Sequence, residues 1–91
     1  MKILSSKRFE RNYKKLIKGN RTLEHKIDKV IYELGVNPFE PRLNTHKLKG
    51  IFEGTWACRV TGDIRVLFEF SQDNSGLYIL LISIGTHDEV Y

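Results

Sequence analysis

The chain has little of what several large protein classes require. One cysteine, Cys58, stands in 91 residues, so an internal disulfide cannot form, and no group of cysteines and histidines has the spacing of a metal site. There is neither a glycine-rich phosphate loop nor the serine or cysteine elbow of a hydrolase. The longest apolar run, residues 77–84, is too short to span a bilayer, and charges follow Met1 at once, unlike a secretory signal. We therefore expect a cytoplasmic protein that needs no metal, cofactor or membrane.

The chain does contain enough apolar residues for one core. Hydrophobic residues make up 41% of the sequence and aromatic residues 11%, which indicates a single folded domain over residues 1–91. Its charge is uneven. Residues 1–29 hold ten of the 15 Lys and Arg residues against three acids, a net charge of +7, and the remainder carries −3. Such a basic lobe is typical of nucleic-acid binding, although taken alone it is more simply interpreted as a solvated helix face.

Hydrophobic periodicity predicts an α+β fold. An edge strand over residues 1–5 precedes a helix that Ser5 or Ser6 caps and Gly19-Asn20 ends; a second helix runs over residues 21–34 and Gly35 ends it. The segment 36–45 contains both prolines and should be extended. Strands are expected at residues 46–48, 55–60, 64–70 and 77–84, with a polar turn at 72–76. This order favours a helical hairpin packed on one face of a mostly antiparallel sheet.

Side-chain alternation fixes the register of the expected central hairpin. Alternate residues of 56–60 and of 64–70 are apolar, and they face the core together only if the turn has three residues, 61–63. That turn places Arg59 directly opposite Arg65, on the face away from the core. Like charges opposite each other are unfavourable by up to about 1 kcal/mol. Either an internal acid (Asp63 or Glu69) or a bound phosphate should lie between them, and the pattern favours neither.

Two histidines stand out beside these cations. His46 precedes Lys47 and Lys49 in a short basic strand, and His87 follows the most apolar strand. Two imidazoles with fixed cations are the minimum equipment for metal-free phosphodiester cleavage, because His exchanges protons near neutral pH and Arg grips phosphate. The simpler interpretations are lysines that protect a sheet edge and a surface histidine near a chain end.

At these residues the sequence resembles the RelE/ParE superfamily of type II toxins, and most closely its YafQ-like messenger-RNA interferases. The resemblance covers essentially the whole chain. Gly-Asp-x-Arg is shared widely in the superfamily, whereas the pairing of the His46 motif with Gly-Thr-His is more specific to YafQ-like nucleases. The stretches that carry it are His46–Gly50, Trp56, Arg59, Gly62–Phe68 and Gly85–Tyr91.

The resemblance implies a RelE-like fold, a ribosomal A-site target, messenger RNA as substrate and a cognate antitoxin that blocks the site. By motif, His46, Asp63 and His87 match catalytic positions, Tyr91 the terminal aromatic, and Arg65 a phosphate-steadying Arg. YafQ-like toxins carry a further His before the turn acid. This chain has none there, so fewer groups can transfer protons.

The chemistry that fits both arguments is attack of an RNA 2′-OH on the adjacent phosphate. One imidazole accepts the hydroxyl proton and the other protonates the leaving 5′-oxygen, while Arg65, with Arg59 or the two lysines, stabilises the phosphorane. Neighbouring charges favour His46 as the base and His87 as the acid. Two alternatives remain: a ParE-like inhibitor of DNA gyrase and a non-catalytic RNA-binding module.

Overall fold

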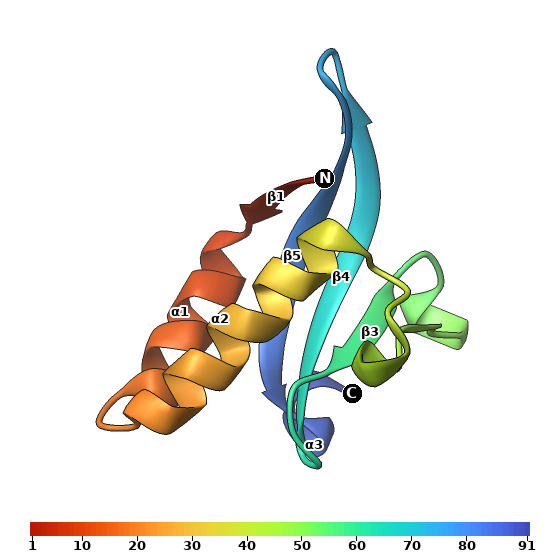
Figure 1. Cartoon of the computed structure of the whole chain (residues 1–91). Coiled ribbons are helices and arrows are strands. Elements are labelled where there is room, and N and C mark those ends of the chain that lie inside the picture. Colours follow the sequence, from red (N-terminus) through yellow and green to blue (C-terminus); the bar gives the residue numbers. More distant parts are fainter.

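The protein is described by a computed structural model that covers residues 1–91. A single five-stranded sheet carries two helices, α1 (Lys7–Ile17) and α2 (Arg21–Val36), which lie on the same side of it (Figure 1). The strand order is β1-β5-β4-β3-β2; β1 runs parallel to β5 and all other neighbours are antiparallel. The α+β prediction is therefore confirmed. The strands are β1 (Lys2–Ser5), β2 (His46–Lys47), β3 (Trp56–Arg59), β4 (Ile64–Asp73) and β5 (Gly76–Thr86).

Local sequence explains the helical hairpin. The Ser6 hydroxyl accepts a hydrogen bond from the Phe9 backbone N–H at 3.0 Å, and the Asn20 side chain accepts one from the Leu23 N–H at 3.1 Å, so both helices begin at capping residues. Gly19, with φ +68°, makes the turn between them. The two helices bury apolar side chains against the sheet, and the Tyr13 hydroxyl of α1 donates a hydrogen bond to the Asp28 carboxylate of α2 at 2.6 Å.

The predicted end of α2 is wrong. The helix continues to Val36 and Asn37 caps it, so Gly35 lies within the helix and not after it. Gly35 is needed for a close approach instead: its carbonyl accepts a hydrogen bond from the Met1 ammonium at 2.9 Å, and a Cβ there would lie 3.1 Å from Cδ1 of Ile3. The glycine thus lets β1 run against the helix end.

Strand lengths also differ from the prediction. β2 ends at Lys47, one residue early, because the chain turns into a short 3-10 helix at Gly50–Phe52. β4 and β5 are longer than expected and stay paired out to Asp73 and Gly76, which shortens the turn between them. The Asp73 carboxylate accepts hydrogen bonds from the Ser75 N–H and from Lys2, which stabilises that tight turn.

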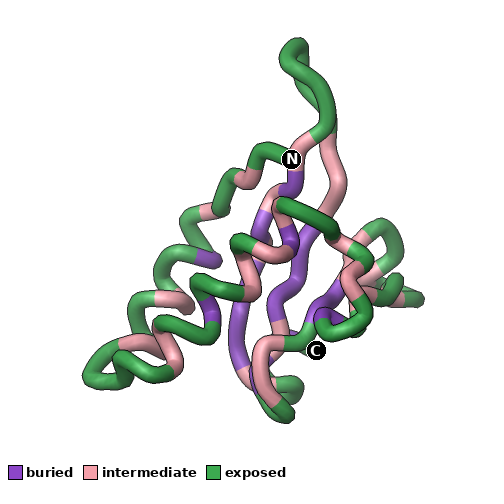
Figure 2. The backbone as a smooth tube through the Cα atoms, in the orientation of Figure 1, coloured by how far each residue is buried: buried purple, intermediate pink, exposed green.

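The core lies between the sheet and the two helices, and buried residues concentrate in the central strands (Figure 2). A smaller apolar cluster occupies the opposite face of the sheet. There a third helix, α3 (His87–Val90), places Val90 against Ala57 and Leu67. This second face was expected to lie away from the core, yet its small cluster anchors the C-terminal helix. None of the helices combines the length and the apolar composition that a membrane span requires.

Candidate active site

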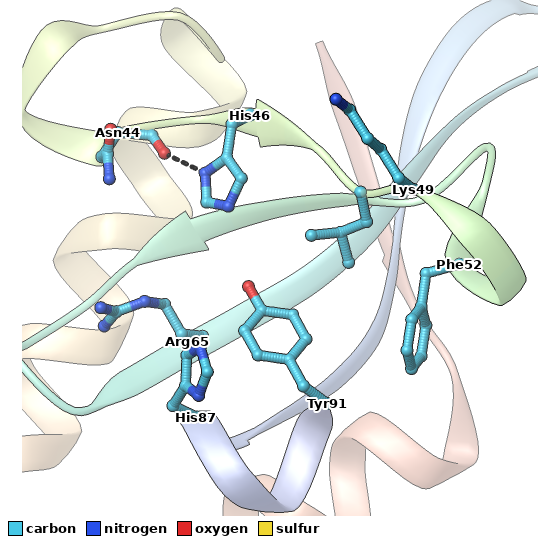
Figure 3. A pocket seen from close by; sticks show the side chains of 8 residues that line it. Asn44, His46, Lys49, Phe52, Arg65, His87 and Tyr91 are labelled. Atoms are coloured by element: carbon cyan, nitrogen blue, oxygen red, sulfur yellow. Dashed lines mark hydrogen bonds between the residues drawn. The ribbon is translucent and has the colours of Figure 1, made fainter.

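A hollow of about 470 Å³ opens where β2, β4 and α3 meet. It gathers both histidines that the sequence singled out, together with Arg65 and Tyr91 (Figure 3). These residues are far apart in the chain. The antiparallel pairing of β2, β3 and β4 brings His46 near Arg65, and the pairing of β4 with β5 brings α3 beside them. The full lining is Asn44, His46, Leu48, Lys49, Phe52, Arg65, His87 and Tyr91.

His46 is held by one hydrogen bond. Its Nδ1 lies 2.8 Å from the backbone carbonyl oxygen of Asn44, and a carbonyl accepts hydrogen bonds only, so Nδ1 carries the proton and donates it. The proton that the ring gains and loses is therefore on Nε2. That nitrogen points toward the space in front of Tyr91 (Figure 3). An imidazole with a free, solvent-accessible Nε2 is equipped to accept a proton.

His87 is positioned by the start of α3. Thr86 and Glu89 form a capping box, in which each side chain binds the other's backbone N–H, and these hydrogen bonds lower the pKa of Glu89. The His87 backbone N–H donates to the carbonyl of Asp63 at 3.0 Å, which ties the helix to the β3–β4 turn. The sequence signal was present, since Thr-x-x-Glu is a capping-box pattern, but the helix itself was not predicted.

Arg65 binds its own turn. Its Nη1 donates to the carbonyl oxygens of Thr61 at 2.8 Å and Ile64 at 3.2 Å. A guanidinium has five N–H groups, so Nε and Nη2 remain available as a fork. The predicted register is confirmed, because Arg65 pairs with Arg59 across β3 and β4.

No acid lies between these two arginines. The four ion pairs of the molecule involve neither guanidinium, so Asp63 and Glu69 do not compensate them. An ion pair with an internal acid is therefore not what holds the two arginines opposite each other; Arg65 is held by the carbonyl oxygens of Thr61 and Ile64.

Tyr91 closes one side of the hollow. Its ring meets the His87 ring edge-on, with centroids 4.4 Å apart, and the Phe52 ring with centroids 6.3 Å apart. Partial burial raises the pKa of Tyr91, although the positive charge of Arg65 opposes the shift. The hydroxyl is therefore protonated at neutral pH and able to donate a hydrogen bond into the hollow.

Three predicted site residues lie outside this hollow. Asp63 contributes its backbone carbonyl to His87, and its carboxylate makes no hydrogen bond. Lys47 lies over the Trp56 ring at 5.4 Å and lines a neighbouring hollow of about 650 Å³, which it shares with Lys49. Arg59 lines a third hollow, of about 430 Å³, between α2 and the β3–β4 turn.

Sequence reasoning assigned no function to three residues of the lining. They are Asn44, Leu48 and Phe52, and no motif marks Asn44 or Phe52. Burial raises the pKa of the Cys58 thiol to about 12, so it is an inert core group. No group of three or more His, Cys, Asp or Glu side chains is placed to hold a metal ion.

Solved structures with the same architecture define the fold. The YoeB/ParE toxin from Agrobacterium tumefaciens has a TM-score of 0.81 and 23% identity, covering 96% of this chain and 99% of its own. A metal-bound toxin from Helicobacter pylori has a TM-score of 0.79 and 25% identity, and the match covers 100% of this chain and 99% of the toxin. The matched chain of the E. coli DinJ–YafQ complex has a TM-score of 0.76 and 18% identity, and the match covers 98% of this chain and 96% of that one. The fold is therefore that of the RelE-type toxins.

The sequence identifies the family within that class. Residues 1–91 match the family described as "Bacterial toxin of type II toxin-antitoxin system, YafQ", and the chain belongs to this family. No curated protein matches the sequence. The predicted resemblance to YafQ-like toxins is thus confirmed over the whole chain.

Proposed function

We propose that this toxin is a metal-independent endoribonuclease that cuts messenger RNA on the ribosome. The observation that carries the proposal is that His46, Arg65, His87 and Tyr91, from three separate elements, line one hollow. Two imidazoles and a guanidinium around one space supply a base, an acid and a phosphate ligand.

In the proposed reaction, Nε2 of His46 removes the proton from an RNA 2′-OH. The 2′-oxygen forms a bond to the adjacent phosphorus, and the bond from phosphorus to the 5′-oxygen breaks. His87, protonated at the start, gives its proton to that leaving oxygen. The products are a 2′,3′-cyclic phosphate, or the 3′-phosphate after hydrolysis, and a 5′-hydroxyl. DNA is not cut because it has no 2′-OH.

Arg65 stabilises the charge that develops on the phosphorane. Because Nη1 is held by the Thr61 carbonyl, the fork of Nε and Nη2 is already oriented before substrate binds, which is the condition for strong electrostatic stabilisation. Lys49 adds positive charge at the rim and the Tyr91 hydroxyl adds a neutral donor. Lys47 and Arg59, from the neighbouring hollows, bind phosphates that flank the cleaved one.

Asp63 acts in this proposal through His87. Its backbone carbonyl holds the first residue of α3, and its carboxylate lies at the turn outside the lining of the hollow. A direct catalytic role for the carboxylate is a prediction from the resemblance, and its position supports a role in placing the acid.

A basic hollow supports the ribosome as the site of action. Lys26, Lys29 and Arg59 line it and none of them forms an ion pair; its single acid, Glu33, is neutralised by Arg42 at 3.2 Å. Three uncompensated cations around one concave surface favour a polyanion such as ribosomal RNA. The hollow belongs partly to the basic lobe that the sequence revealed.

The second proposed partner is a cognate antitoxin. The E. coli YafQ structure contains DinJ, and this chain shares its fold. An antitoxin that covers the open, cationic hollow would place acidic side chains against His46, Arg65 and His87. A short acidic reading frame next to this one is the simplest supporting observation, and a copurifying complex that cannot cleave RNA is the biochemical one.

Toeprinting of a translated messenger RNA tests the function directly. We expect new cleavage stops on ribosome-bound RNA when the toxin is present and little cleavage of the same RNA without ribosomes. Equal cleavage of both would contradict ribosome dependence. No cleavage, together with inhibition of DNA gyrase supercoiling, would assign the protein to the ParE-like alternative, and RNA binding without cleavage to the non-catalytic one.

Metal independence has its own test, because the H. pylori neighbour binds metal. Toxin dialysed against a chelator, with its metal content measured, is returned to ribosomes in magnesium buffer. We expect an unchanged cleavage rate. A rate that falls and recovers on adding a transition metal would overturn this part of the proposal.

A further inference from the structure

Asn44 is the one non-glycine residue with a positive φ. Its backbone angles, φ 49° and ψ 44°, are left-handed, and every other positive φ belongs to a glycine. Asparagine tolerates this region better than most residues, but a β-branched side chain does not. The unusual geometry has a specific result, since it is the Asn44 carbonyl oxygen that accepts the hydrogen bond from Nδ1 of His46 at 2.8 Å.

The residues around Asn44 hold that carbonyl still. Leu43 is 2% exposed and belongs to the core, and the Asn44 N–H donates to the Pro41 carbonyl at 3.2 Å. On the other side, the Thr45 hydroxyl donates to the Pro38 carbonyl at 2.6 Å. The two prolines also restrict the loop itself. Asn44 is therefore fixed from both directions.

His46, by contrast, has little else to orient it. It lies exposed on a two-residue edge strand, and the bond to Asn44 is the one hydrogen bond that its ring makes. Rotation about the bond to an imidazole ring is broad when nothing restrains it. The Asn44 carbonyl selects one ring orientation and, at the same time, the tautomer with the proton on Nδ1.

We propose that Asn44 is a positioning residue whose left-handed backbone directs its carbonyl at Nδ1 of His46 and so presents an unprotonated Nε2 to the RNA 2′-OH. The catalytic part rests on the proposed function, whereas the tautomer is a property of the free toxin. The competing interpretation is that Asn44 only forms a turn, or that its side chain, which lines the hollow, contacts substrate.

Two substitutions separate these interpretations. Asn44→Gly removes the side chain and keeps the left-handed backbone, whereas Asn44→Val opposes that backbone. In ¹⁵N spectra of the free protein, recorded where its histidines are neutral, we expect His46 to carry its proton on Nδ1 in the wild type and in Asn44→Gly. In Asn44→Val the signal should shift toward the Nε2-protonated tautomer, while His25 and His87 stay unchanged as internal controls.

Cleavage rates complete the test. We expect kcat of Asn44→Val to be about 10- to 100-fold lower than kcat of Asn44→Gly, with KM little changed. Should the valine variant not fold, Asn44→Ala imposes the same conflict more mildly. A proton on Nε2 in the wild type would overturn the proposal, as would loss of activity in Asn44→Gly with the tautomer intact. The expected tautomer in a wild type that cleaves no RNA would contradict the proposed function alone.

Discussion

The backbone N–H of His87 donates a hydrogen bond to the carbonyl oxygen of Asp63 at 3.0 Å. This bond joins the β3–β4 turn to the first residue of α3 and fixes the proposed acid relative to Arg65, which follows two residues after Asp63. The relationship uses the main chain of Asp63 and leaves its carboxylate free. It therefore separates two roles that a motif match cannot distinguish.

Asp63→Asn tests that separation. Because the carbonyl is unchanged, we expect the variant to lose less than about tenfold in single-turnover cleavage, far less than a missing general acid costs. Asp63→Ala also keeps the backbone carbonyl and removes the carboxylate, so its cleavage rate should be similar to that of Asp63→Asn. A loss of 100-fold or more in Asp63→Asn would show that the carboxylate itself acts in catalysis.

His87→Ala should abolish toxicity and leave the fold intact. The side chain is 60% exposed and packs on Tyr91 alone among the aromatic residues, so the free energy of unfolding should fall by less than about 1 kcal/mol. Loss of a proton-transfer group should lower the cleavage rate by at least about 100-fold. Growth arrest, toeprinting and thermal unfolding measure the three effects. His25→Ala, on α2, is the control that should change none of them, and a folded, fully toxic His87→Ala would remove His87 from catalysis.

Arg65→Lys should be nearly as damaging as Arg65→Ala, with rates lower by about 100-fold or more in both. Lysine replaces a planar fork with one ammonium, which cannot bind the Thr61 carbonyl and two phosphate oxygens in the same geometry. Arg59→Lys makes the same exchange at the residue paired with Arg65 but outside the hollow, so it should affect RNA binding and not the single-turnover cleavage rate of the bound complex. Near-normal cleavage by folded Arg65→Lys would mean that the site requires charge alone.

Replacing Lys26 and Lys29 by alanine should weaken ribosome binding and reduce its salt dependence. Each lost phosphate contact lowers the slope of log affinity against log salt by about 0.7 to 0.9. The cleavage rate of the bound complex should not change, since neither lysine lines the proposed active site. Lys15→Ala with Lys18→Ala removes the same charge from the last turn of α1 and its C-cap, outside the hollow. An equal effect there would indicate that net charge alone attracts the ribosome.

Tyr13→Phe should destabilise the protein and flatten its response to alkaline pH. The Tyr13 hydroxyl donates to the Asp28 carboxylate at 2.6 Å, and this hydrogen bond raises the pKa of Tyr13 to about 12 from an ordinary 10. Because the folded-state pKa is the higher one, the stabilisation is fully present below pH 10 and is lost as the pH rises toward 12.

Urea unfolding at pH 7 and pH 11 measures this effect. We expect Tyr13→Phe to lose about 1 kcal/mol at pH 7 and to show a smaller loss than the wild type between the two values. Tyr32→Phe is the control, since Tyr32 lies exposed on α2 and makes no hydrogen bond to the protein. Identical pH dependence in wild type and Tyr13→Phe would contradict the assignment.

Local and periodic features of this protein were readable from its sequence. Alternation of apolar residues places Arg59 opposite Arg65, because a strand repeats every two residues and a three-residue turn leaves one register that buries both apolar sets. Capping preferences, which act within a few residues, offer Ser5 or Ser6 as the start of the first helix, and the structure selects Ser6; Asn20 was predicted only to end that helix, whereas it also caps the next one.

Other features depended on contacts between distant segments. Gly35 has the sequence pattern of a helix end, but it lies within α2. Only the packing of β1 shows that the glycine lets this strand lie close to the helix. Lys47 and Lys49 were expected in one basic strand, yet β2 ends at Lys47. Of the two lysines, only Lys49 lines the hollow with the histidines.

The sequence by itself determined the family, the fold class and the residue types of the site, because these follow from motifs, periodicity and composition. The tertiary structure decided which of those residues share one space and how each is oriented. Asn44 and Phe52 join the site through a left-handed backbone and an aromatic contact with Tyr91, both of which exist only after the chain has folded. The convergence of His46 and His87 has the same cause, since strand pairing across 41 residues of chain brings the two imidazoles to one hollow.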